Sequence, residues 1–247
     1  MIDLHCHILP GVDDGAPNLE VALAMARALV SVGFSAVAAS PHIGTGPGGD
    51  VSPSIASGAR AGLSIALEQC GVPLTLLPNG EHQLSTELFD RLGTSDVTSI
   101  GGRGRWLLTE LPWGGLANLE SVLFRVQTKG WRVLLAHPER FDFLSLDTLQ
   151  RLCERGVRLQ LDLGSFVGMF GDAARERAME LVEQGGAHVL ATDMHRPDDG
   201  EAWLSSALKA VLKHFGREAL VLGTETNPQR ILEDVAPDSL PSIVENP

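Results

Sequence analysis

Residues 1–15 of the chain read MIDLHCHILPGVDDG, a short apolar run that ends in two histidines one residue apart. Successive side chains of a strand point to opposite faces, so His5 and His7 project to one side and Cys6 points to the other. Two imidazoles at the end of one strand can bind a metal ion, although an isolated pair of this kind is also common in ordinary polar loops. The rest of the chain decides between these two interpretations.

The remainder of the chain, 247 residues in all, alternates apolar runs with stretches of helical spacing, such as 18–33 and 172–184. About seven such units predict an α/β fold with a parallel sheet and outer helices. The length suits one closed or nearly closed barrel, and no G-x-G-x-x-G follows the first run to favour an open dinucleotide-binding sheet. Without a linker between the units, we expect a single domain over 1–235 and an acidic tail over 236–247.

Composition excludes several classes of function. The net charge of −12 argues against a protein that binds the phosphate backbone of nucleic acid. Aromatic residues make up 5% of the chain and tyrosine is absent, so a platform for stacking bases is not expected. No apolar run reaches the ~18 residues of a membrane span. The three widely spaced cysteines form no disulfide framework, so we expect a reducing, cytoplasmic setting.

Candidate metal ligands recur where the apolar runs end. They are His5 and His7 after the first run, His42 after the second, Glu81 after the third, Glu110 after the fourth, His137 after the fifth, and Asp193 and His195 after the seventh, with Asp14 in the loop behind the first run. The carboxyl ends of the strands of a parallel barrel open on one face, so these side chains should meet there. The remaining histidines, His82, His188 and His214, do not share this placement.

So many carboxylates and imidazoles in one barrel mouth would be a costly cluster without cations. The sequence therefore predicts a multinuclear metal site. Nitrogen and oxygen ligands without a thiolate suit Zn, Mn, Fe, Ni or Co better than Ca or Cu(I). Strand alternation turns Cys6 away from the site, so we interpret it as a buried structural thiol.

The ordered set of motifs resembles the PHP (polymerase and histidinol phosphatase) superfamily. The motifs are the opening H-x-H, PH at 41–42, GE at 80–81, TEL at 109–111, AHPER at 136–140 and TDMH at 192–195. The opening segment, HPERF, ATDMH and NPQRIL at 227–232 further resemble the bacterial protein-tyrosine phosphatases that regulate capsule and exopolysaccharide synthesis. The resemblance runs from Met1 to about Glu233, and it implies a distorted (β/α)7 TIM-like barrel, the PHP fold, with a trinuclear metal centre.

The resemblance implies three divalent metal ions, with Mn, Fe and Zn as candidates. The first would be held by His5, His7, Glu81 and Asp193; the second by Glu110 and His137, with Glu81 as the bridge; the third by Asp14, His42 and His195. Arg140 would bind the phosphate. The family often has a second arginine beyond the D-x-H motif, but this chain reads RPDDGE at 196–201. Arg196 is then the candidate replacement for substrate binding.

The activity implied by the resemblance is that of a metal-dependent phosphomonoesterase. We expect a protein-tyrosine phosphatase acting on a phosphotyrosine protein, such as the tail of a bacterial tyrosine kinase. A small-molecule phosphatase of the histidinol-phosphate type, a phosphodiesterase and a non-catalytic, metal-stabilised interaction module remain as alternatives. No C-x5-R motif follows any cysteine, so no covalent cysteine intermediate is expected. His42 and Asp14 are both candidate general acids, and the oligomeric state is left open.

Overall fold

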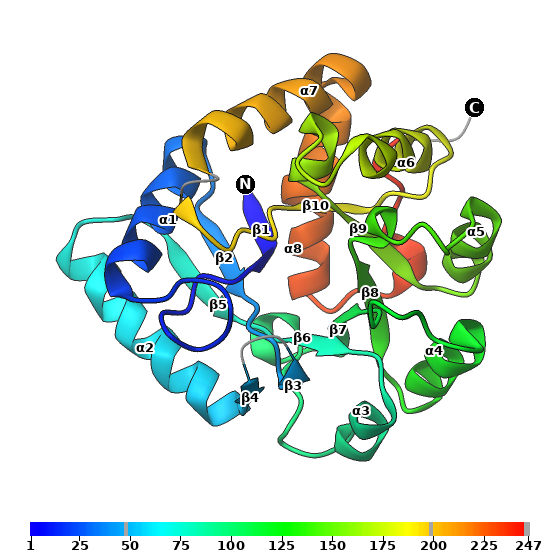
Figure 1. The fold of residues 1–247 in the computed structure, drawn as a ribbon, viewed down its shortest axis with the longest axis horizontal. Helices are drawn as coiled ribbons and strands as arrows, with labels where there is room; N and C mark the ends of the chain where they lie inside the picture. Colours follow the sequence, from blue (N-terminus) through cyan, green and yellow to red (C-terminus); the bar gives the residue numbers. More distant parts are fainter. Residues whose placement is uncertain (47–48, 198–199, 245–247) are drawn as a thin grey trace.

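The computed structural model describes residues 1–46, 49–197 and 200–244 (Figure 1). Within these residues, eight parallel strands form two segments of sheet. One has the order β1 (Ile2–Cys6), β2 (Ala36–Ala39), β5 (Thr75–Pro78); the other has the order β10 (Val189–Ala191), β9 (Arg158–Asp162), β8 (Arg132–Ala136), β7 (Trp106–Glu110), β6 (Glu81–Gln83). A short antiparallel pair, β3 (Gly44–Gly46) and β4 (Gly49–Val51), lies between β2 and α2 (Pro53–Gln69).

The two segments of sheet meet at two isolated parallel bridges, Cys6 with Met194 and His42 with Glu81. At the first bridge the backbone N–H of His7 donates to the carbonyl of Met194 at 3.0 Å. At the second, the N–H of Glu81 donates to the carbonyl of Pro41, also at 3.0 Å. Single bridges in place of full ladders make the barrel distorted, and the α/β barrel predicted from the sequence is confirmed.

The third apolar run of the sequence is broken in two at Asn79 and Gly80. Its first half, β5, pairs with β2, and its second half, β6, pairs with β7. The Asn79 amide donates to the carbonyl of Leu4 at 3.0 Å and to the Ser40 hydroxyl at 2.9 Å. A Cβ at Gly80 would lie 2.4 Å from Cγ1 of Ile43, so only glycine fits there. Seven sequence units therefore produce eight strands.

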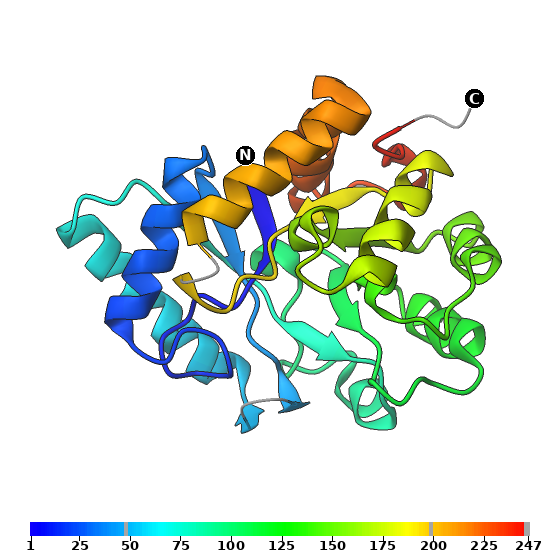
Figure 2. The ribbon, with the colours of Figure 1, turned by 45° about the horizontal axis from the view of Figure 1, so that its top comes forward.

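Helices surround the strands, and α7 begins beside α1 in both Figure 1 and Figure 2. Their bounds are α1 (Leu19–Ser31), α2 (Pro53–Gln69), α3 (Thr86–Arg91), α4 (Leu119–Thr128), α5 (Leu146–Glu154), α6 (Asp172–Glu183), α7 (Gly200–Val221) and α8 (Asn227–Leu232). Short 3-10 turns are η1 (Ile100–Gly102), η2 (Pro138–Arg140), η3 (Leu163–Val167) and η6 (Pro237–Ser239), and a π-helical turn, η5 (Leu222–Thr226), follows α7. No described helix is long and apolar enough to cross a membrane.

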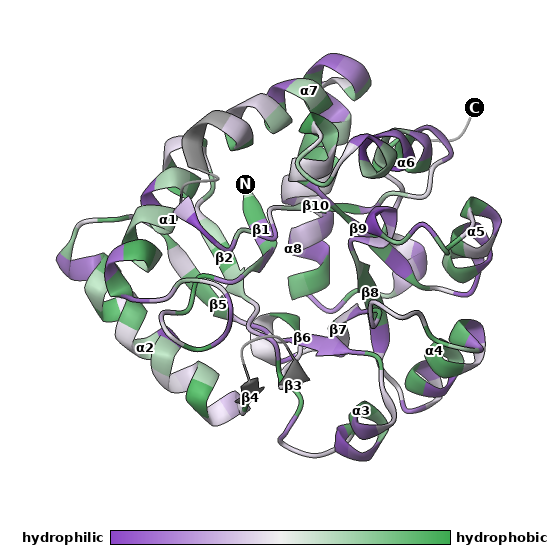
Figure 3. Ribbon diagram, viewed as in Figure 1, coloured by the Kyte–Doolittle hydropathy of each residue, from purple (hydrophilic) through white to green (hydrophobic). Residues whose placement is uncertain are grey.

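Local sequence sets where several helices begin. Asn18, Ser52, Ser85 and Ser145 each precede a helix, and each side chain accepts a hydrogen bond from a backbone N–H of the first turn. Such caps satisfy amide groups that have no partner inside the helix. Figure 3 shows hydrophobic and hydrophilic residues alternating along these helices, as expected where one face packs on the strands.

A compact apolar cluster fills the barrel below the strand ends. On β7, Trp106 and Leu108 are fully buried and share a face with Glu110 because side chains alternate along a strand. Leu134 of β8 belongs to the same cluster. The interior is thus apolar at one end of these strands and charged at the other.

The last described residues pack against the barrel. Leu240 and Ile243 are 2% exposed, and the N–H of Ile243 donates to the carbonyl of Ala187 at 2.8 Å. The segment expected to be an acidic tail from residue 236 is therefore packed up to residue 244, while residues 245–247 lie outside the described chain. The domain boundary at 235 stays a prediction.

Candidate metal centre

The two histidines of the opening motif point to the same place, as their spacing predicts. Their Nε2 atoms lie 3.2 Å apart, and both rings are buried. Oδ1 of Asp193 lies 3.2 Å from Nε2 of His5 and 3.4 Å from Nε2 of His7. Oε2 of Glu81 lies 3.4 Å and 3.3 Å from the same two atoms. Four donor atoms from strands far apart in sequence thus converge on one point.

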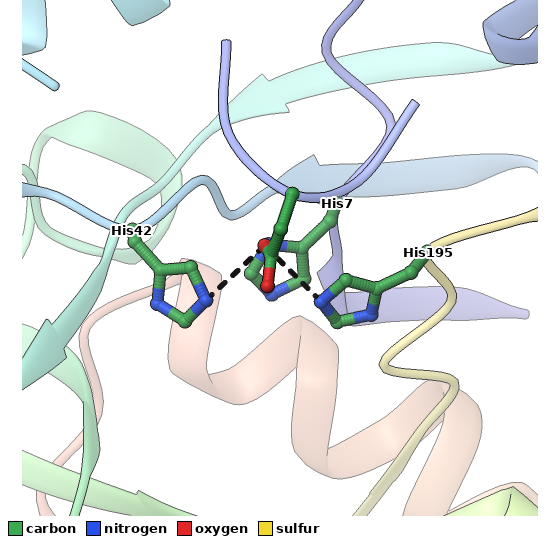
Figure 4. A group of neighbouring side chains, drawn as sticks. His7, His42 and His195 are labelled. Carbon is green, nitrogen blue, oxygen red and sulfur yellow. Dashed lines mark ion pairs between the residues drawn. The ribbon is translucent and has the colours of Figure 1, made fainter. Parts of the chain in front are cut away.

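A second group of donors gathers around Asp14 at the edge of the mouth. Its Oδ1 lies 3.4 Å from Nε2 of His42 and 3.5 Å from Nε2 of His195. Figure 4 shows His42 and His195 approaching from opposite sides, with His7 between them. The rings of His7 and His195 stack with centroids 4.0 Å apart, so this group adjoins the first.

Glu81 connects these groups to the remaining two predicted ligands. Its Oε1 lies 3.1 Å from Nε2 of His137, and its Oε2 lies 3.2 Å from Nδ1 of His42. Oε1 of Glu110 lies 3.4 Å from the same His42 nitrogen. The donor atoms of Glu110 therefore group with those of His42, and those of His137 with His5 and Asp193. The expected pairing of Glu110 with His137 at one ion stays a prediction.

Two of these ligands sit on unusual backbone. His137 has φ of 37° and Asp193 has φ of 48°, and these are two of four described non-glycine residues with positive φ. A side chain in the left-handed region costs energy, and such residues cluster at functional sites because the surrounding fold holds them. Here the turn at the strand end aims each side chain into the mouth.

The field inside the mouth favours positive charge. Burial alone would lower the pKa of His5, but the carboxylates of Glu81 and Asp193 raise it to about 9. Burial likewise opposes protonation of His42, whose pKa is raised to about 10 by Asp14 and Glu110. Although burial opposes its ionisation, the pKa of Glu81 is held well below its usual range by His5 and His137. Imidazoles that attract protons so strongly occupy a site that cations would stabilise.

The residues present fit divalent cations. The walls of the cavity, about 80 Å³, carry the carboxylates of Asp14, Glu81, Glu110 and Asp193 against one guanidinium, that of Arg140. All nine predicted ligands fall into groups whose donor atoms lie within 4.8 Å of one another. Oε1 of Glu110 is buried, and no contact to it in the described chain has the geometry of a hydrogen bond, with Nδ1 of His42 lying 3.4 Å away. Imidazole and carboxylate donors without thiolate suit Mn, Fe or Zn.

Two residues that the sequence patterns did not reveal orient the first two histidines. Oδ2 of Asp13 lies 2.7 Å from Nδ1 of His7, and Oε1 of Gln160 lies 2.8 Å from Nδ1 of His5. An acceptor at Nδ1 places the proton there and leaves the Nε2 lone pair facing the cavity. The Asp13-Asp14 pair is a visible signal, but the role of each carboxylate depends on the folded loop.

Arg140 lies beside the candidate ligands. Its Nη1 donates to Oδ2 of Asp193 at 2.7 Å and to Oδ2 of Asp162 at 3.2 Å. Asp162 is fully buried at the end of β9 and also accepts from the Gln160 amide at 2.8 Å. It occupies the same position on the sixth run as the predicted ligands occupy on theirs, so the strand-end pattern could have found it.

Glu139 connects the loops after β8 and β9 through hydrogen bonds. Its Oε1 accepts from the backbone N–H of Asp162 at 2.8 Å and from the Ser165 hydroxyl at 2.7 Å. Burial and the neighbouring carboxylate of Asp162 raise the pKa of Glu139 to about 7. Within four residues, the HPER motif therefore supplies a candidate metal ligand, a carboxylate that connects two loops, and a guanidinium.

Arg196 lies outside the metal cavity. It is exposed and lines a neighbouring cavity of about 540 Å³ together with Asp13, Asp14 and Pro17. The carboxylate of Asp14 thus faces both cavities. A role for Arg196 in substrate binding stays a prediction, and Asp198, Asp199 and the side chain of Glu201 lie outside the described chain.

The other histidines and Cys6 lie where the sequence placed them. Nε2 of His82 is 3.0 Å from the carbonyl of Thr98, and Nδ1 of His188 accepts from the N–H of Leu159 at 3.3 Å. His214 is exposed on α7. Cys6 is buried in the apolar core, and its thiol contacts the carbonyl of Met194 at 3.6 Å. The structure thus groups five histidines at the mouth and places these three elsewhere.

Comparison with known proteins places this geometry in a family. The family described as capsular polysaccharide synthesis, CpsB/CapC, matches residues 1–233. A tyrosine-protein phosphatase of Bacillus subtilis, YwqE, is 32% identical over 228 residues, covering 91% of this chain and 89% of its own. The tyrosine-protein phosphatase CpsB of Streptococcus pneumoniae is 23% identical and covers 95% of this chain and 99% of its own.

Solved structures agree with the sequence comparison. A chain from the crystal structures of YwqE and CpsB, described as unique metal-dependent tyrosine phosphatases, matches with a TM-score of 0.87 and 30% identity over 100% of both chains. A phosphotriesterase homology protein from Escherichia coli matches with a TM-score of 0.57 over 94% of this chain and 98% of its own. Because the identity is 15%, this match supports the barrel fold alone.

Proposed function

The chain belongs to the CpsB/CapC family of capsular polysaccharide synthesis, and from that premise we propose that it is a metal-dependent tyrosine-protein phosphatase. One observation carries the proposal. Nine imidazole and carboxylate side chains from the ends of distant strands converge in one mouth, next to the guanidinium of Arg140. The similar proteins of Bacillus subtilis and Streptococcus pneumoniae are tyrosine-protein phosphatases, and a chain from their crystal structures matches over the whole of this chain.

The active form would hold three divalent ions, with Mn, Fe or Zn as candidates. His5, His7, Glu81 and Asp193 would hold the first; Glu110, His137 and a bridging Glu81 the second; and Asp14, His42 and His195 the third. The approaches of 3.2 to 3.5 Å between these donor atoms support the first and third sets. When bound, such ions would neutralise phosphate oxygens and lower the pKa of a water molecule towards neutrality.

Arg140 would hold the phosphate group of the substrate. Both of its described hydrogen bonds are donated by Nη1, to Asp162 and Asp193. These bonds fix the plane of the guanidinium, and its other N–H groups can fork onto two phosphate oxygens. Because the guanidinium is held before the substrate arrives, little ordering is left to do at the moment of binding.

His42 and Asp14 are the two candidates for the group that protonates the leaving oxygen, and either one would do so only while it is not bound to the third ion. The Asp14 side chain is 40% exposed, and its Oδ1 lies 3.4 Å from Nε2 of His42 at the edge of the mouth. Protonated His42 is a donor, a proton that it gives up would be replaced from water, and the nearby Asp14 carboxylate would favour the protonated imidazole. A phenolate leaving group needs less help from an acid than an alkoxide does, which favours an aryl ester.

A covalent cysteine intermediate has no support in this fold. Cys6 lies closest to the site but points into the apolar core, and burial raises the pKa of its thiol well above the usual value. A thiol becomes a nucleophile only as the thiolate, which this environment disfavours. Attack by water directly on phosphorus accounts for the arrangement instead.

The substrate would be a phosphotyrosine segment of a protein, such as the tail of a bacterial tyrosine kinase that controls capsule or exopolysaccharide synthesis. A protein in contact with such a tail would act in the cytoplasm. The three cysteines, Cys6, Cys70 and Cys153, are free, which supports a reducing compartment. The net charge of −12 does not support nucleic acid as a partner.

Activity after metal removal tests the proposal. The protein would be stripped with a chelator, reloaded with Mn, Fe or Zn, and assayed on a phosphotyrosine peptide, a phosphoserine peptide and histidinol phosphate. We expect hydrolysis of the phosphotyrosine peptide that disappears on stripping and returns on reloading. Faster turnover of histidinol phosphate would replace the proposal with a small-molecule phosphatase. No hydrolysis of any ester by the loaded protein would favour an interaction module.

A further inference from the structure

Large apolar side chains stand at the mouth of the barrel on three successive loops. Trp113 follows β7, Phe143 follows β8, and Met169 and Phe170 follow η3 after β9. We call these three aromatic residues, together with Met169, the aromatic rim. Because the loops after parallel strands lie on the active face of a barrel, the rim shares that face with the candidate metal ligands.

The rim is unusually exposed for its composition. Trp113 is 59% exposed, Phe143 48% and Met169 40%. Large apolar side chains gathered in the open commonly mark a binding surface. Buried Phe141 anchors two of them, with its ring centroid 5.2 Å from that of Trp113 and 5.4 Å from that of Phe143. The rim is thus a supported surface.

The rim lies directly against the group that would bind phosphate. The guanidinium carbon of Arg140 lies 5.2 Å from the ring centroid of Trp113 and 4.2 Å from that of Phe170. Trp113 also lines the metal cavity together with Arg140 and His137. Charged donors for a phosphate and an apolar surface therefore occupy adjacent positions.

We propose that the aromatic rim binds the aryl ring of the substrate and selects aryl phosphates over alkyl phosphates. The inference rests on the proposed phosphatase function. In an aryl phosphate one oxygen joins the ring to phosphorus, so the ring lies just outside the phosphate site. An alkyl ester such as phosphoserine has only a methylene and its own polar backbone at that place. Offset or edge-to-face packing against Trp113 stabilises a ring and gains little from a methylene.

A role in stability alone does not explain Trp113. More than half of its surface faces solvent, while the tryptophan that packs the barrel, Trp106, is fully buried. Cation–π contact with Arg140 occupies one part of the Trp113 ring and orients it. The exposed remainder faces the same opening as the metal cavity, where a substrate ring would enter.

Binding of two phosphonates to Mn-loaded protein tests the inference. Phenylphosphonate and methylphosphonate carry the same charged head and differ in the ring, and neither is hydrolysed. For Trp113→Ala we expect phenylphosphonate to bind ~10-fold more weakly, with methylphosphonate affinity unchanged. Phe143→Ala should lower phenylphosphonate affinity in the same direction by a smaller factor. The matched control is Phe124→Ala, because Phe124 of α4 is also 59% exposed and lies outside the rim; it should change neither affinity.

The outcomes separate the inference from the function on which it rests. Equal loss for both phosphonates in Trp113→Ala would overturn aryl recognition and assign Trp113 to the positioning of Arg140. Unchanged phenylphosphonate affinity in both rim variants, with normal phosphotyrosine hydrolysis by the wild type, would overturn the inference and leave the phosphatase proposal standing. A loaded wild type that binds neither phosphonate and hydrolyses no ester would overturn both. Thermal unfolding of each variant confirms that folded protein is compared.

Discussion

The two ends of the barrel strands are built from opposite chemistry. On β7, Trp106 and Leu108 lie in an apolar interior, and Glu110 on the same face lies among imidazoles and carboxylates. On β8, Leu134 belongs to that interior, and His137 follows at the strand end. The apolar end stabilises the fold by removing hydrocarbon from water, while the charged end holds buried polar groups that oppose folding unless they are paired.

The pKa values of the histidines differ in the same way between the mouth and the rest of the protein. At the mouth, carboxylates overcome the effect of burial and raise the pKa of His5 to about 9 and of His42 to about 10. Away from the mouth, burial lowers the pKa of His188 to about 3 and of His82 to about 4. One residue type is thus a candidate metal ligand at the charged end and a neutral packing group elsewhere.

Removal of a mouth histidine should have the largest effect on activity and little effect on the fold. We expect His137→Ala to lower the rate of phosphotyrosine hydrolysis by ~10³-fold or more, because it removes a nitrogen donor from the candidate metal site. Circular dichroism should show an intact barrel, and chelation of the wild type should reproduce the loss. Activity of the variant above a tenth of the wild-type rate would remove His137 from the site.

A substitution in the apolar interior, on the same strand, should do the reverse. Leu134→Ala leaves a cavity in the barrel interior and should lower the free energy of unfolding by about 2 to 5 kcal/mol. The turnover number of the folded fraction should stay within about twofold of the wild type. Urea unfolding and steady-state kinetics measure the two quantities, and a large fall in turnover without a fall in stability would show that the two ends are not separable.

Substitution of a residue that forms a hydrogen bond to a candidate ligand should have an intermediate effect on metal binding. Gln160→Leu removes the acceptor that lies 2.8 Å from Nδ1 of His5, and we expect ~10- to 100-fold weaker Mn²⁺ binding by calorimetry. Gln160→Glu, which keeps an oxygen at that position, is the matched control and should lose less affinity. Equal loss of Mn²⁺ affinity in both variants would mean that the hydrogen bond from the Gln160 side chain to Asp162 matters more than the orientation of His5.

The smallest effect is expected from a histidine outside the mouth, and only in acid. The pKa of His188 is lowered in the folded protein, so the unfolded chain binds the proton more readily; stability is present above the unfolded pKa near 6.5 and is lost as the pH falls towards about 3. The loss from this residue is at most about 1.4 kcal/mol per pH unit. His188→Asn keeps an acceptor for the Leu159 N–H and should flatten the stability profile between pH 6.5 and 5. An unchanged profile would assign the acid sensitivity to other groups.

Much of the site was predictable because the strands of a parallel barrel all end on one face, so residues at the ends of successive strands lie close together. All nine predicted ligands lie at the mouth, since eight stand at the end of an apolar run whose direction the fold fixes and Asp14 lies in the loop after the first run. Asp162 ends the sixth run in the same way and was still missed, because no histidine or familiar motif drew attention to it. The individual ion sites were harder to assign: the grouping of Glu110 with His42 depends on side-chain directions that sequence position does not fix.

The sequence pattern could not predict the residues that orient the candidate ligands, nor the break in the third strand. Asp13 and Gln160 act through one hydrogen bond each to a ligand ring, and nothing in their spacing distinguishes them from other loop or strand polar residues. The division of one run into β5 and β6 depends on Asn79 bonding to Leu4 and Ser40, which are distant in sequence. Periodicity identifies a strand and its end, while partners across the barrel decide where it changes neighbours.

Anomalous diffraction from crystals loaded with Mn²⁺ tests the central claim most directly. We expect three peaks inside the mouth: one within bonding distance of His5, His7 and Asp193, one beside Asp14, His42 and His195, and one between Glu81, Glu110 and His137. Peaks confined to surface carboxylates, or a mouth that binds no manganese while the protein still hydrolyses phosphotyrosine, would contradict it.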